Sequence, residues 1–401
     1  MTPFNATSFR QHFPALMQSG VYLDSAATAL TPQAVIDAVQ QFYREGSGTV
    51  HRSQHRSAQR LTQCFEHTRE QVAALLHAQD PRTIIWTKGA TEAINLVAQS
   101  YARPRLRPGD EIVVSEAEHH ANLIPWLIVA EQTGARVVKL PIGADFLPDI
   151  GRLAELLNAK TRLLALGHMS NVTGGMPDLA KAIRLAHQYG AVVMVDGAQG
   201  VVHCPPNVQA LDIDFYAFSA HKLYAPTGLG VLYGKTALLE SMAPWQGGGK
   251  MMTHVSFDGF TPQAIPHRFE AGTPHIAGVL GLSAAVDWLS RQDWQTAEQY
   301  SQNLARQAEM QLAQFAGFRS FRCSGSSVLS FEFAGVHHND LVTLLAESGI
   351  ALRAGHHCAQ PLMAALGING TLRASFAPFN NEQDIDLLIA AVGAALELLT
   401  D

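Results

Sequence analysis

Short β-branched runs alternate with helical stretches through much of the chain, and this alternation restricts the possible folds more than any other feature. The runs include TIIWT (83–87), EIVVS (111–115), ARVVKLPI, RLLALGH and AVVMVDGA, with periodic helical segments between them. Strands that alternate with helices in this way form βαβ units, in which helices cover both faces of a parallel sheet. The sequence therefore predicts an α/β fold with a mainly parallel sheet.

The pattern changes after about Phe260. From there on, two long helical segments, AGVLGLSAAVDWLS and DLVTLLAESG, flank the strand-like runs SVLSFEFAG and TLRASFAP. A chain of 401 residues exceeds the ~250–300 residues that one hydrophobic core usually covers, so a second, smaller α+β domain is expected. We predict an N-terminal segment, 1–20, that packs with the small domain, a large domain, 21–260, and a small C-terminal domain, 261–401.

Composition excludes several classes of partner. The net charge is −6, and Lys and Arg form no long run, so the basic surface of a nucleic-acid-binding protein is not expected. No signal-peptide pattern and no run of about 18 uncharged apolar residues occurs, which predicts a cytoplasmic protein without membrane contacts. Charged residues make up only 15% of the chain, which favours a homo-oligomer. Four cysteines without a Cys-x-x-Cys pair are typical of a reducing compartment.

The turn after the run FYAFS carries a lysine in an unusual setting. In FYAFSAHKLYAPTG (215–228), Lys222 closely follows apolar residues that are expected to be buried. A desolvated lysine has a lowered pKa and reacts as a nucleophile with carbonyl compounds. Because open α/β sheets bind ligands at the carboxyl ends of their strands, we expect Lys222 to lie at such a crevice.

Two further strand ends carry groups that suit the same ligand. The segment TKGATEAIN (87–95) places Gly89 and Ala90 at a helix start, where free N–H groups favour a phosphate; an ordinary capping box is the alternative. Asp196 ends the strand VVMVD and would meet a cation such as a protonated ring nitrogen, although a helix cap or salt bridge is the commoner role of a lone aspartate. Pyridoxal phosphate requires these three groups of its protein: a cradle for the phosphate, an aspartate that pairs with the ring nitrogen, and a reactive lysine.

The chain resembles the cysteine desulfurases of the SufS/CsdA type, a branch of the class-V, fold-type-I pyridoxal-phosphate enzymes. The resemblance extends over nearly the whole chain and rests on the motifs YLDSAATAL, VHRSQH, EHHANLIPW, SNVTGG, VDGAQG, FSAHKLYAPTGLGVLYG, FEAGTP, RAGHHCAQP and RASFAPFN. It implies that the large domain binds pyridoxal 5′-phosphate and that the small C-terminal domain carries a loop with a reactive cysteine.

The resemblance also implies a role for each matching residue. Lys222 matches the lysine that bonds the cofactor, Cys358 the sulfur-accepting cysteine, and His119 a histidine that stacks on the cofactor ring and assists proton transfer. The other matches hold the cofactor or the substrate: Asp196 at the ring nitrogen, Gln199 at the phenolic oxygen, Asn171 at cofactor and substrate, Arg373 at the substrate carboxylate, and around the phosphate the Ala90 backbone, Thr91, Ser219, His221 and, from the neighbouring subunit, Thr273.

Three alanines depart from the pattern of the family. Ala90 stands where many relatives have threonine, and Ala220 and Ala225 stand where many have glycine. A methyl group at either of the last two positions would add strain if the backbone there had a positive φ.

The segment RAGHHCAQP (353–361) would hold the sulfur chemistry. A loop cysteine beside histidines can be activated as a thiolate and attack a substrate sulfur. A buried structural cysteine and a zinc site of His356, His357 and Cys358 are the alternatives, but adjacent histidines rarely turn both rings to one ion, so no metal is predicted. Cys358 is only a few residues from Ala354 and from Pro361, so we expect a loop too short to carry the sulfur far.

As a whole, the resemblance implies an enzyme that converts L-cysteine to L-alanine. The sulfur would remain as a persulfide on Cys358 and pass to a small SufE-like (CsdE-type) acceptor, for use in iron–sulfur cluster assembly. Selenocysteine and cysteine sulfinate are further expected substrates, and Thr273 implies a homodimer with sites at the interface. Two alternatives stay open: another fold-type-I enzyme, such as an aminotransferase or a kynureninase-like β-cleaving enzyme, and a non-catalytic sulfur carrier.

Overall fold

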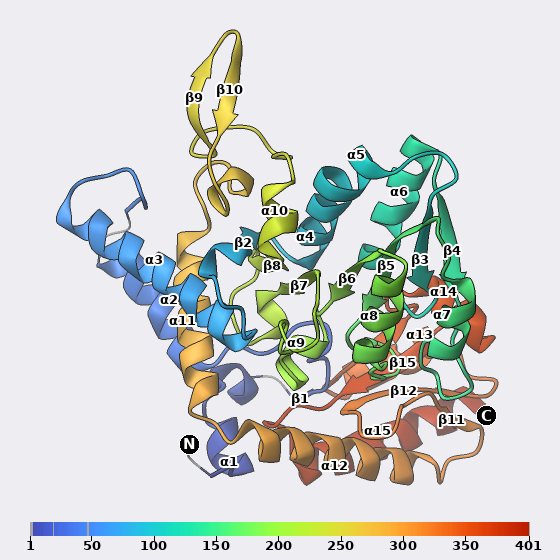
Figure 1. Ribbon diagram of the computed structural model, residues 1–401. Helices are drawn as coiled ribbons and strands as arrows, with labels where there is room; N and C mark the ends of the chain where they lie inside the picture. The colour runs from blue at the N-terminus through green and yellow to red at the C-terminus, as the bar shows by residue number, and fades with distance from the viewer. Residues whose placement is uncertain (1–2, 19, 46–47, 401) are drawn as a thin grey trace.

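The fold is built around a seven-stranded sheet in the order β2-β8-β7-β6-β5-β3-β4 (Figure 1). The computed structural model describes residues 3–18, 20–45 and 48–400. In sheet order the strands are β2 (Ile84–Thr87), β8 (Gly230–Gly234), β7 (Phe215–Ser219), β6 (Val192–Asp196), β5 (Thr161–Gly167), β3 (Glu111–Ser115) and β4 (Arg136–Leu140). Neighbouring strands from β7 to β4 pair in parallel, and β8 is antiparallel to both β7 and β2. The predicted mainly parallel sheet is confirmed.

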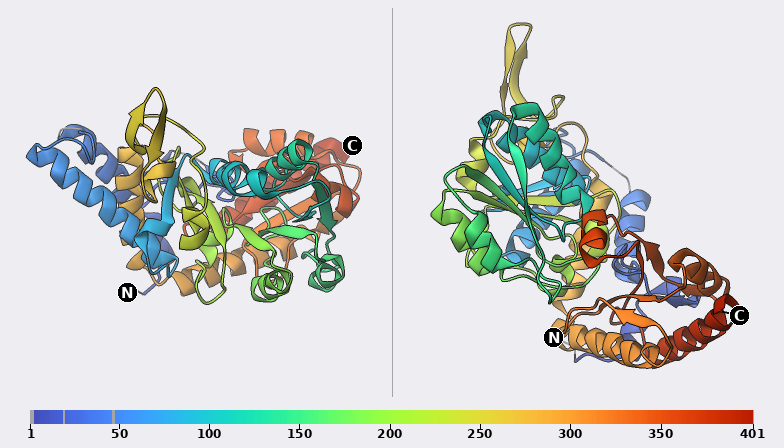
Figure 2. Two further views of the ribbon diagram at one scale, coloured as in Figure 1. Left: turned by 45° about the horizontal axis from the view of Figure 1, so that its top comes forward. Right: turned by 90° about the vertical axis from the view of Figure 1, so that its right-hand side faces the viewer.

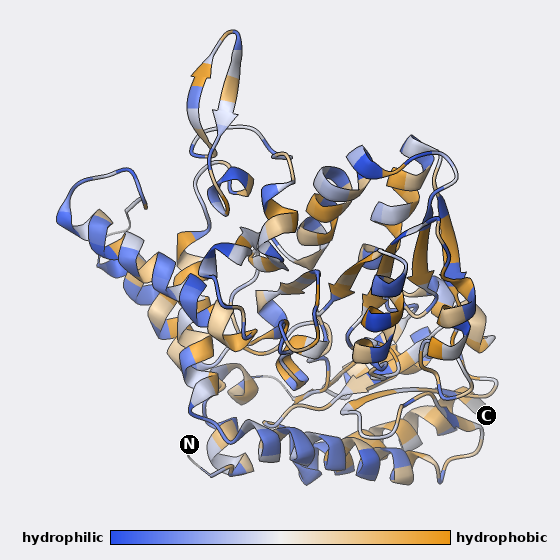
Figure 3. Ribbon diagram, in the orientation of Figure 1, coloured by the Kyte–Doolittle hydropathy of each residue, from blue (hydrophilic) through white to orange (hydrophobic). Residues whose placement is uncertain are grey.

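Successive side chains of a strand point to opposite faces of the sheet. Apolar clusters cover both faces of this sheet. Along β7, Phe215 and Ala217 belong to one apolar cluster, and Tyr216 and Phe218 belong to another. In Figure 3 the strands of the sheet are accordingly mostly orange. This two-sided burial explains why the strands occur in the sequence as continuous apolar runs.

The helices divide between the two faces. The cluster on the Tyr216 side includes residues of α2 (Gln33–Arg44), α3 (Arg56–Leu75), α7 (Ile150–Leu156), α8 (Leu179–Gln188), α9 (Gly200–His203) and α11 (Ile276–Ser290). The cluster on the Phe215 side includes residues of α4 (Ala90–Leu96), α6 (Ile124–Thr133) and α10 (Thr236–Glu240), and α4 continues through one π-helical segment into α5 (Arg103–Arg105). Among the helices described, none combines the length and the apolar character needed to cross a membrane.

A smaller, antiparallel sheet of four strands forms the C-terminal part of the molecule. Its strands, in order, are β11 (Phe318–Ser320), β12 (Val328–Phe333), β15 (Thr371–Ser375) and β14 (Arg353–Gly355). A third apolar cluster joins this sheet to α12 (Trp294–Leu312), α13 (His338–Glu347) and α15 (Glu382–Thr400), and α14 (Gln360–Leu366) belongs to a fourth. In the right-hand view of Figure 2, these elements (orange to red) lie beside the large sheet.

The N-terminal segment contacts this C-terminal part. It begins with α1 (Ala6–Arg10), and further on the ring of Phe13 lies 4.9 Å from that of Phe379. The next strand, β1 (Val21–Tyr22), pairs in parallel with β13 (Ile350–Ala351). The exact division of the chain into 1–20, 21–260 and 261–401 stays a prediction.

A hairpin of β9 (Met252–Ser256) and β10 (Gly259–Pro262) projects from the large sheet at the top of Figure 1. Its apolar side chains Val255, Phe257 and Phe260 are exposed. Exposed apolar side chains gathered on one element are typical of a contact surface.

Candidate active site

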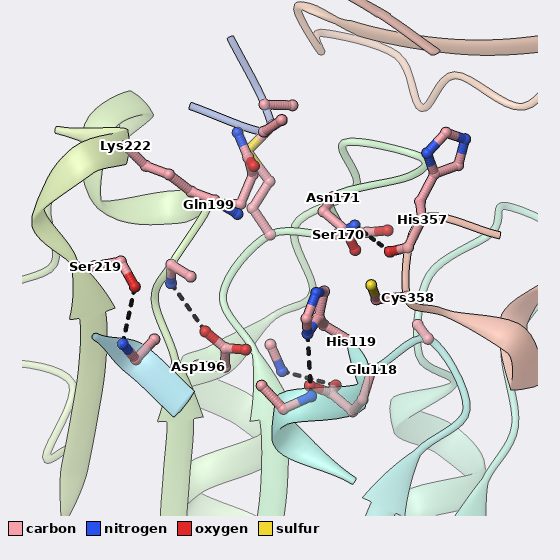
Figure 4. A pocket seen from close by; sticks show the side chains of 18 of the residues that line it. Glu118, His119, Ser170, Asn171, Asp196, Gln199, Ser219, Lys222, His357 and Cys358 are labelled. Atoms are coloured by element: carbon pink, nitrogen blue, oxygen red, sulfur yellow. Dashed lines mark hydrogen bonds between the residues drawn. The ribbon is translucent and has the colours of Figure 1, made fainter. Parts of the chain in front are cut away.

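The carboxyl ends of the parallel strands open into a cavity of about 240 Å³ (Figure 4). The segments that follow β3, β5, β6 and β7 line one side of it, and β14, β15 and the loop before α14 line the other. This edge is where open α/β sheets bind ligands. Every predicted site residue except Thr273 lines the cavity: Ala90, Thr91, His119, Asn171, Asp196, Gln199, Ser219, His221, Lys222, Cys358 and Arg373.

Lys222 ends the short turn (Ala220–Lys222) that follows β7. Burial lowers the pKa of Lys222 to about 8, although the charge of Asp196 acts in the opposite direction. A neutral fraction of the amine is therefore present near neutral pH. A neutral amine of this kind can act as a nucleophile and as a base.

Asp196 is buried at the end of β6, and its Oδ1 accepts a hydrogen bond of 2.9 Å from the backbone N–H of Ala198. Burial raises the pKa of Asp196, and this hydrogen bond and the charge of Lys222 act to lower it. Within the part of the chain that the structure describes, no ion pair involves Asp196. Its other oxygen is thus left to meet a cation such as a protonated ring nitrogen.

The start of α4 meets the end of β7 at the predicted phosphate cradle. The N–H of Ala90 donates to Ser219 Oγ at 2.8 Å, and a Cβ added to Gly89 would lie 3.3 Å from the same oxygen. Glu92 accepts from the N–H of Lys88, and the N-cap residue Gly89 has no side-chain cap, so the structure shows no capping box here. The start of α4 thus has no side-chain cap and lies at the cavity wall, as the predicted backbone cradle requires.

His119 follows β3 and points into the cavity (Figure 4). Its Nδ1 accepts a hydrogen bond of 3.0 Å from the backbone N–H of Ala121, which assigns the ring proton to Nε2. Burial, followed by the charge of Lys222, lowers the pKa of His119 to about 4. The imidazole is therefore neutral near neutral pH and keeps an Nε2–H donor.

Glu118 is a buried residue of the cavity wall that the sequence analysis did not single out. Its carboxyl oxygens accept hydrogen bonds of 2.7 Å from the Asn122 side chain and of 2.8 Å from the backbone N–H of Gly167. Burial raises the pKa of Glu118 to about 8. These bonds join the segment that bears His119 to the end of β5. The motif EHHANLIPW contains Glu118, but no local pattern points to this contact.

Cys358 lies on a loop that hydrogen bonds hold against the large sheet. Its carbonyl accepts from the N–H of His120 at 2.7 Å, and the carbonyl of His357 accepts from Asn171 Nδ2 at 2.8 Å. His357 and Cys358 have φ of 52° and 53°, which non-glycine residues adopt where their surroundings hold them. Cys358 is exposed, whereas the buried His357 ring lies 2.9 Å from Thr371 Oγ1, so the two side chains do not form a zinc site (Figure 4).

Two arginines reach the cavity from the C-terminal sheet. Arg373 is buried, and its guanidinium donates to Asp24 Oδ1 at 3.2 Å and to the carbonyl of Asn171 at 3.0 Å. Arg353 also lines the cavity, and its partner in the β14–β15 register is Arg373. Only Arg373 was expected from the sequence. Arg353 lies in the same motif as Cys358, and only the strand register places it beside Arg373.

Gln199 completes the polar wall of the cavity. It is buried, and its Oε1 has no hydrogen-bond partner among the described residues, which is uncommon for a buried polar atom. A buried amide that is only partly satisfied, a lysine of lowered pKa, a buried aspartate and a backbone cradle together suit an aromatic cofactor with a phosphate, a ring nitrogen and an aldehyde. The residues present therefore fit pyridoxal phosphate.

Thr273 lies outside this cavity. It lines a second hollow, of about 360 Å³, together with Trp86, Gly228 and Trp245. Its predicted contact with the phosphate in a neighbouring subunit stays a prediction.

The three alanines that depart from the family pattern, Ala90, Ala220 and Ala225, cause no backbone strain. Neither Ala220 nor Ala225 is among the described residues with positive φ, and Ala90 begins the regular helix α4. Their methyl groups are buried in the core.

One group among the described residues could bring three metal-ligand atoms together: His51, Glu66 and His267. It lies outside the cavity, and Arg69 donates to the carboxylate of Glu66 at 2.8 Å. A guanidinium so close disfavours a second cation at the same carboxylate.

Comparison of the chain with known proteins identifies its family. The family model of the class-V aminotransferases matches residues 21–388 of this chain. The chain is 66% identical over 401 residues to the cysteine desulfurase CsdA of Escherichia coli (strain K12), with 100% of each chain covered. It is 51% identical over 401 residues to a probable cysteine desulfurase of Vibrio cholerae, with 98% and 99% covered. The crystal structure of CsdA (S-sulfonic acid) from Escherichia coli has a TM-score of 0.95 and covers 99% of this chain and 100% of that chain.

The chain therefore belongs to the class-V aminotransferase family of pyridoxal-phosphate enzymes. The predicted fold class and cofactor are confirmed. Within the family, its relatives place it among the cysteine desulfurases.

Proposed function

We propose that this protein takes sulfur from L-cysteine, releases L-alanine and holds the sulfur as a persulfide on Cys358. The observation that carries the proposal is a single cavity lined by Lys222, Cys358 and Arg373. These residues supply a nucleophilic amine, a thiol and a carboxylate-binding guanidinium. An aminotransferase or a kynureninase-like enzyme would have no need of the thiol, and a non-catalytic carrier would have no need of the amine.

Pyridoxal phosphate, when bound, supplies an electron-accepting ring that activates the bonds at the substrate α-carbon. We assign Lys222 to the covalent link, Asp196 to the ring nitrogen and Gln199 to the phenolic oxygen. The remaining contacts are His119 at the ring face, Asn171 beside cofactor and substrate, and Ala90 N–H, Thr91, Ser219 and His221 at the phosphate.

The proton transfers fall to Lys222 and His119. Lys222, whose pKa burial lowers to about 8, accepts the α-proton of the substrate in its neutral form. His119 is neutral because burial lowers its pKa to about 4, and it has an Nε2–H to donate. Arg373 fixes the substrate carboxylate, so that the α-carbon and the sulfur have set positions.

Cys358 takes the sulfur. Its thiolate attacks the substrate sulfur, so an S–S bond forms while the C–S bond breaks; the bonding electrons go to the carbon fragment, which is protonated and leaves as alanine. The hydrogen bonds to His120 and Asn171 hold the loop at the cavity and limit its reach. A small SufE-like (CsdE-type) acceptor would therefore bring its own cysteine to Cys358 and carry the sulfur towards iron–sulfur cluster assembly.

The proposal extends to assembly, location and further substrates. Thr273 serves the phosphate of the other subunit in a homodimer with two interfacial sites. The reducing character of the cysteine set favours the cytoplasm. Selenocysteine and cysteine sulfinate are further substrates, because selenium and sulfinate can leave without attack by a thiol.

The test is alanine release over time from purified holoenzyme at fixed L-cysteine. We expect a burst of about one equivalent per site, because the persulfide on Cys358 blocks the next cycle, and then a slow phase. An acceptor protein or a reducing thiol should accelerate the slow phase. Release that is linear from the start and indifferent to both would contradict the covalent intermediate, and a keto acid in place of alanine would identify an aminotransferase.

A further inference from the structure

Two side chains outside the proposed catalytic set, His203 and Glu298, stand directly behind Gln199. His203 ends α9, one helical turn after Gln199, and its Nε2 lies 3.2 Å from Gln199 Nε2. His203 Nδ1 lies 2.9 Å from Glu298 Oε1, on α12. The two side chains are only 11% and 13% exposed, so water competes little for this bond.

The directions of these hydrogen bonds follow from the carboxylate. A carboxylate accepts hydrogen bonds, so Glu298 selects the tautomer of His203 that carries its proton on Nδ1, and in this tautomer Nε2 is an acceptor. The amide nitrogen of Gln199 must then donate to Nε2. This assignment, made from the network, fixes the amide and leaves its second N–H and its unpaired Oε1 on the side away from His203.

A small void shows that this chain of bonds borders the reaction site. It measures about 20 Å³, room for about one water molecule, and Gln199, Lys222, His203 and Glu298 all line it. Ser375, of the C-terminal sheet, lines its far side. The pair is therefore next to the reactive lysine without lining the main cavity.

We propose that His203 and Glu298 are positioning residues that set the direction of the Gln199 amide and so keep one of its N–H groups free for the phenolic oxygen of the cofactor. This inference rests on the proposed function. Because Glu298 belongs to α12, the same bonds couple the cofactor pocket to the C-terminal part. A pocket built by the large sheet alone would lack this support.

Two other ionisable side chains lie near His203 and Glu298, and neither is charged in a way that would reverse the direction of their hydrogen bonds. Burial lowers the pKa of His168 to about 4. Burial, and to a lesser degree the charge of Glu298, raises the pKa of Tyr224. Both side chains are therefore neutral near neutral pH.

The experiment compares His203→Leu, which removes the acceptor for the amide, with His203→Gln, whose side-chain oxygen can replace it. The two readouts are the Kd of pyridoxal phosphate, from titration of the apoprotein, and the pH midpoint of the visible absorption of the holoenzyme. His203→Leu should weaken the cofactor about three- to tenfold, the effect of one oriented hydrogen bond. Its pH midpoint should rise, since an anionic oxygen that loses a donor binds a proton more readily. His203→Gln should stay near wild type in both.

A matched control comes from His187, which is 2.7 Å from the Asp214 carboxylate and lies outside the cavity. His187→Leu should lower the thermal midpoint but leave the Kd and the absorption unchanged. If His203→Leu does not fold, Glu298→Leu, which removes the acceptor for His203 Nδ1, should shift the absorption midpoint in the same direction.

Two results would overturn the inference: a folded His203→Leu protein with wild-type Kd and absorption, or a His203→Gln protein as impaired as His203→Leu. In either case, wild-type protein that binds pyridoxal phosphate and forms alanine would leave the proposed function standing. Wild-type protein that binds no pyridoxal phosphate would overturn both.

Discussion

Arg353 and Arg373 are partners across the β14–β15 ladder, and both line the cavity. Like charges at opposed positions destabilise a sheet unless an anion lies near. Arg373 has the carboxylate of Asp24 at 3.2 Å, whereas Arg353 is exposed and takes part in no ion pair of the described residues. A substrate carboxylate is the anion that we expect to complete this arrangement.

Substitution of Arg353 should therefore affect only KM, whereas substitution of Arg373 should affect both KM and Tm. Arg353→Gln should raise the KM for L-cysteine about tenfold with little change in Tm, because one exposed charge-assisted bond is lost. Arg373→Gln should raise KM and also lower Tm, because Asp24 loses a buried partner. Arg319→Gln, on the same sheet but outside the cavity, is the control and should leave KM unchanged. Equal Tm values for the two cavity variants would contradict the distinction.

Lys222→Ala should lose about 10²–10⁴-fold in turnover, the usual contribution of a positioned proton-transfer group. Borohydride reduction should then attach no cofactor to the polypeptide, as mass spectrometry can show. Lys139→Ala, an exposed lysine on β4, should behave as wild type. Cofactor that is still fixed to the Lys222→Ala chain would place the covalent link elsewhere.

The rate of covalent cofactor uptake should depend on pH. Burial lowers the pKa of Lys222 to about 8, and only the neutral amine attacks the aldehyde. The rate at which the apoprotein turns yellow should therefore rise with pH through about 8 and level off above it, and fall below it as the ammonium form accumulates. An inflection near about 10.4, the value of an unperturbed lysine, would show that the amine is not desolvated.

Cys358→Ala should separate sulfur transfer from the cofactor chemistry. The variant should stay folded and yellow and form no persulfide from L-cysteine, while still releasing alanine from selenocysteine and cysteine sulfinate, whose leaving groups need no thiol. Cys204→Ala, which removes another exposed cysteine, should leave all three activities intact. Loss of every activity in Cys358→Ala would indicate that the residue mainly maintains the loop.

Mixed dimers can test the role of Thr273. In the proposed homodimer, Thr273→Val in both subunits should weaken cofactor binding about tenfold, since a hydrogen bond to an anion is lost. A dimer of one Thr273→Val subunit and one Lys222→Ala subunit has one intact lysine, and its site would receive the intact threonine of the other chain. That site should bind the cofactor as wild type does. Weak binding in the mixed dimer would mean that Thr273 acts within its own chain.

The cofactor side of the site could be predicted because parallel strands end at one edge of a sheet. Asp196, Ser219 and Lys222 each follow an apolar run, so the alternation of strands and helices alone brings them together. The positions of strand ends are a local property of the sequence, and hydrophobic runs mark them.

The supporting contacts could not be predicted, since they join segments far apart in the chain. His203 and Glu298 are 95 residues apart and meet because the start of α12 lies against α9, where Trp294 donates a hydrogen bond to the carbonyl of Val202. Arg353 reaches the cavity through the register of an antiparallel pair, which a shift of one residue would reverse. The family resemblance gave most of the roles, but neither these contacts nor the anchoring of the Cys358 loop.

The loop between β14 and α14 also matters for redesign of the reaction. The wall that holds Lys222 and Asp196 belongs to the large sheet, whereas Cys358 belongs to a short segment between β14 and α14 that hydrogen bonds to His120 and Asn171 hold at the cavity. Mutations confined to that segment can remove or restore a thiol without moving the residues that hold the cofactor. The same turn is therefore the natural place to redesign the reaction.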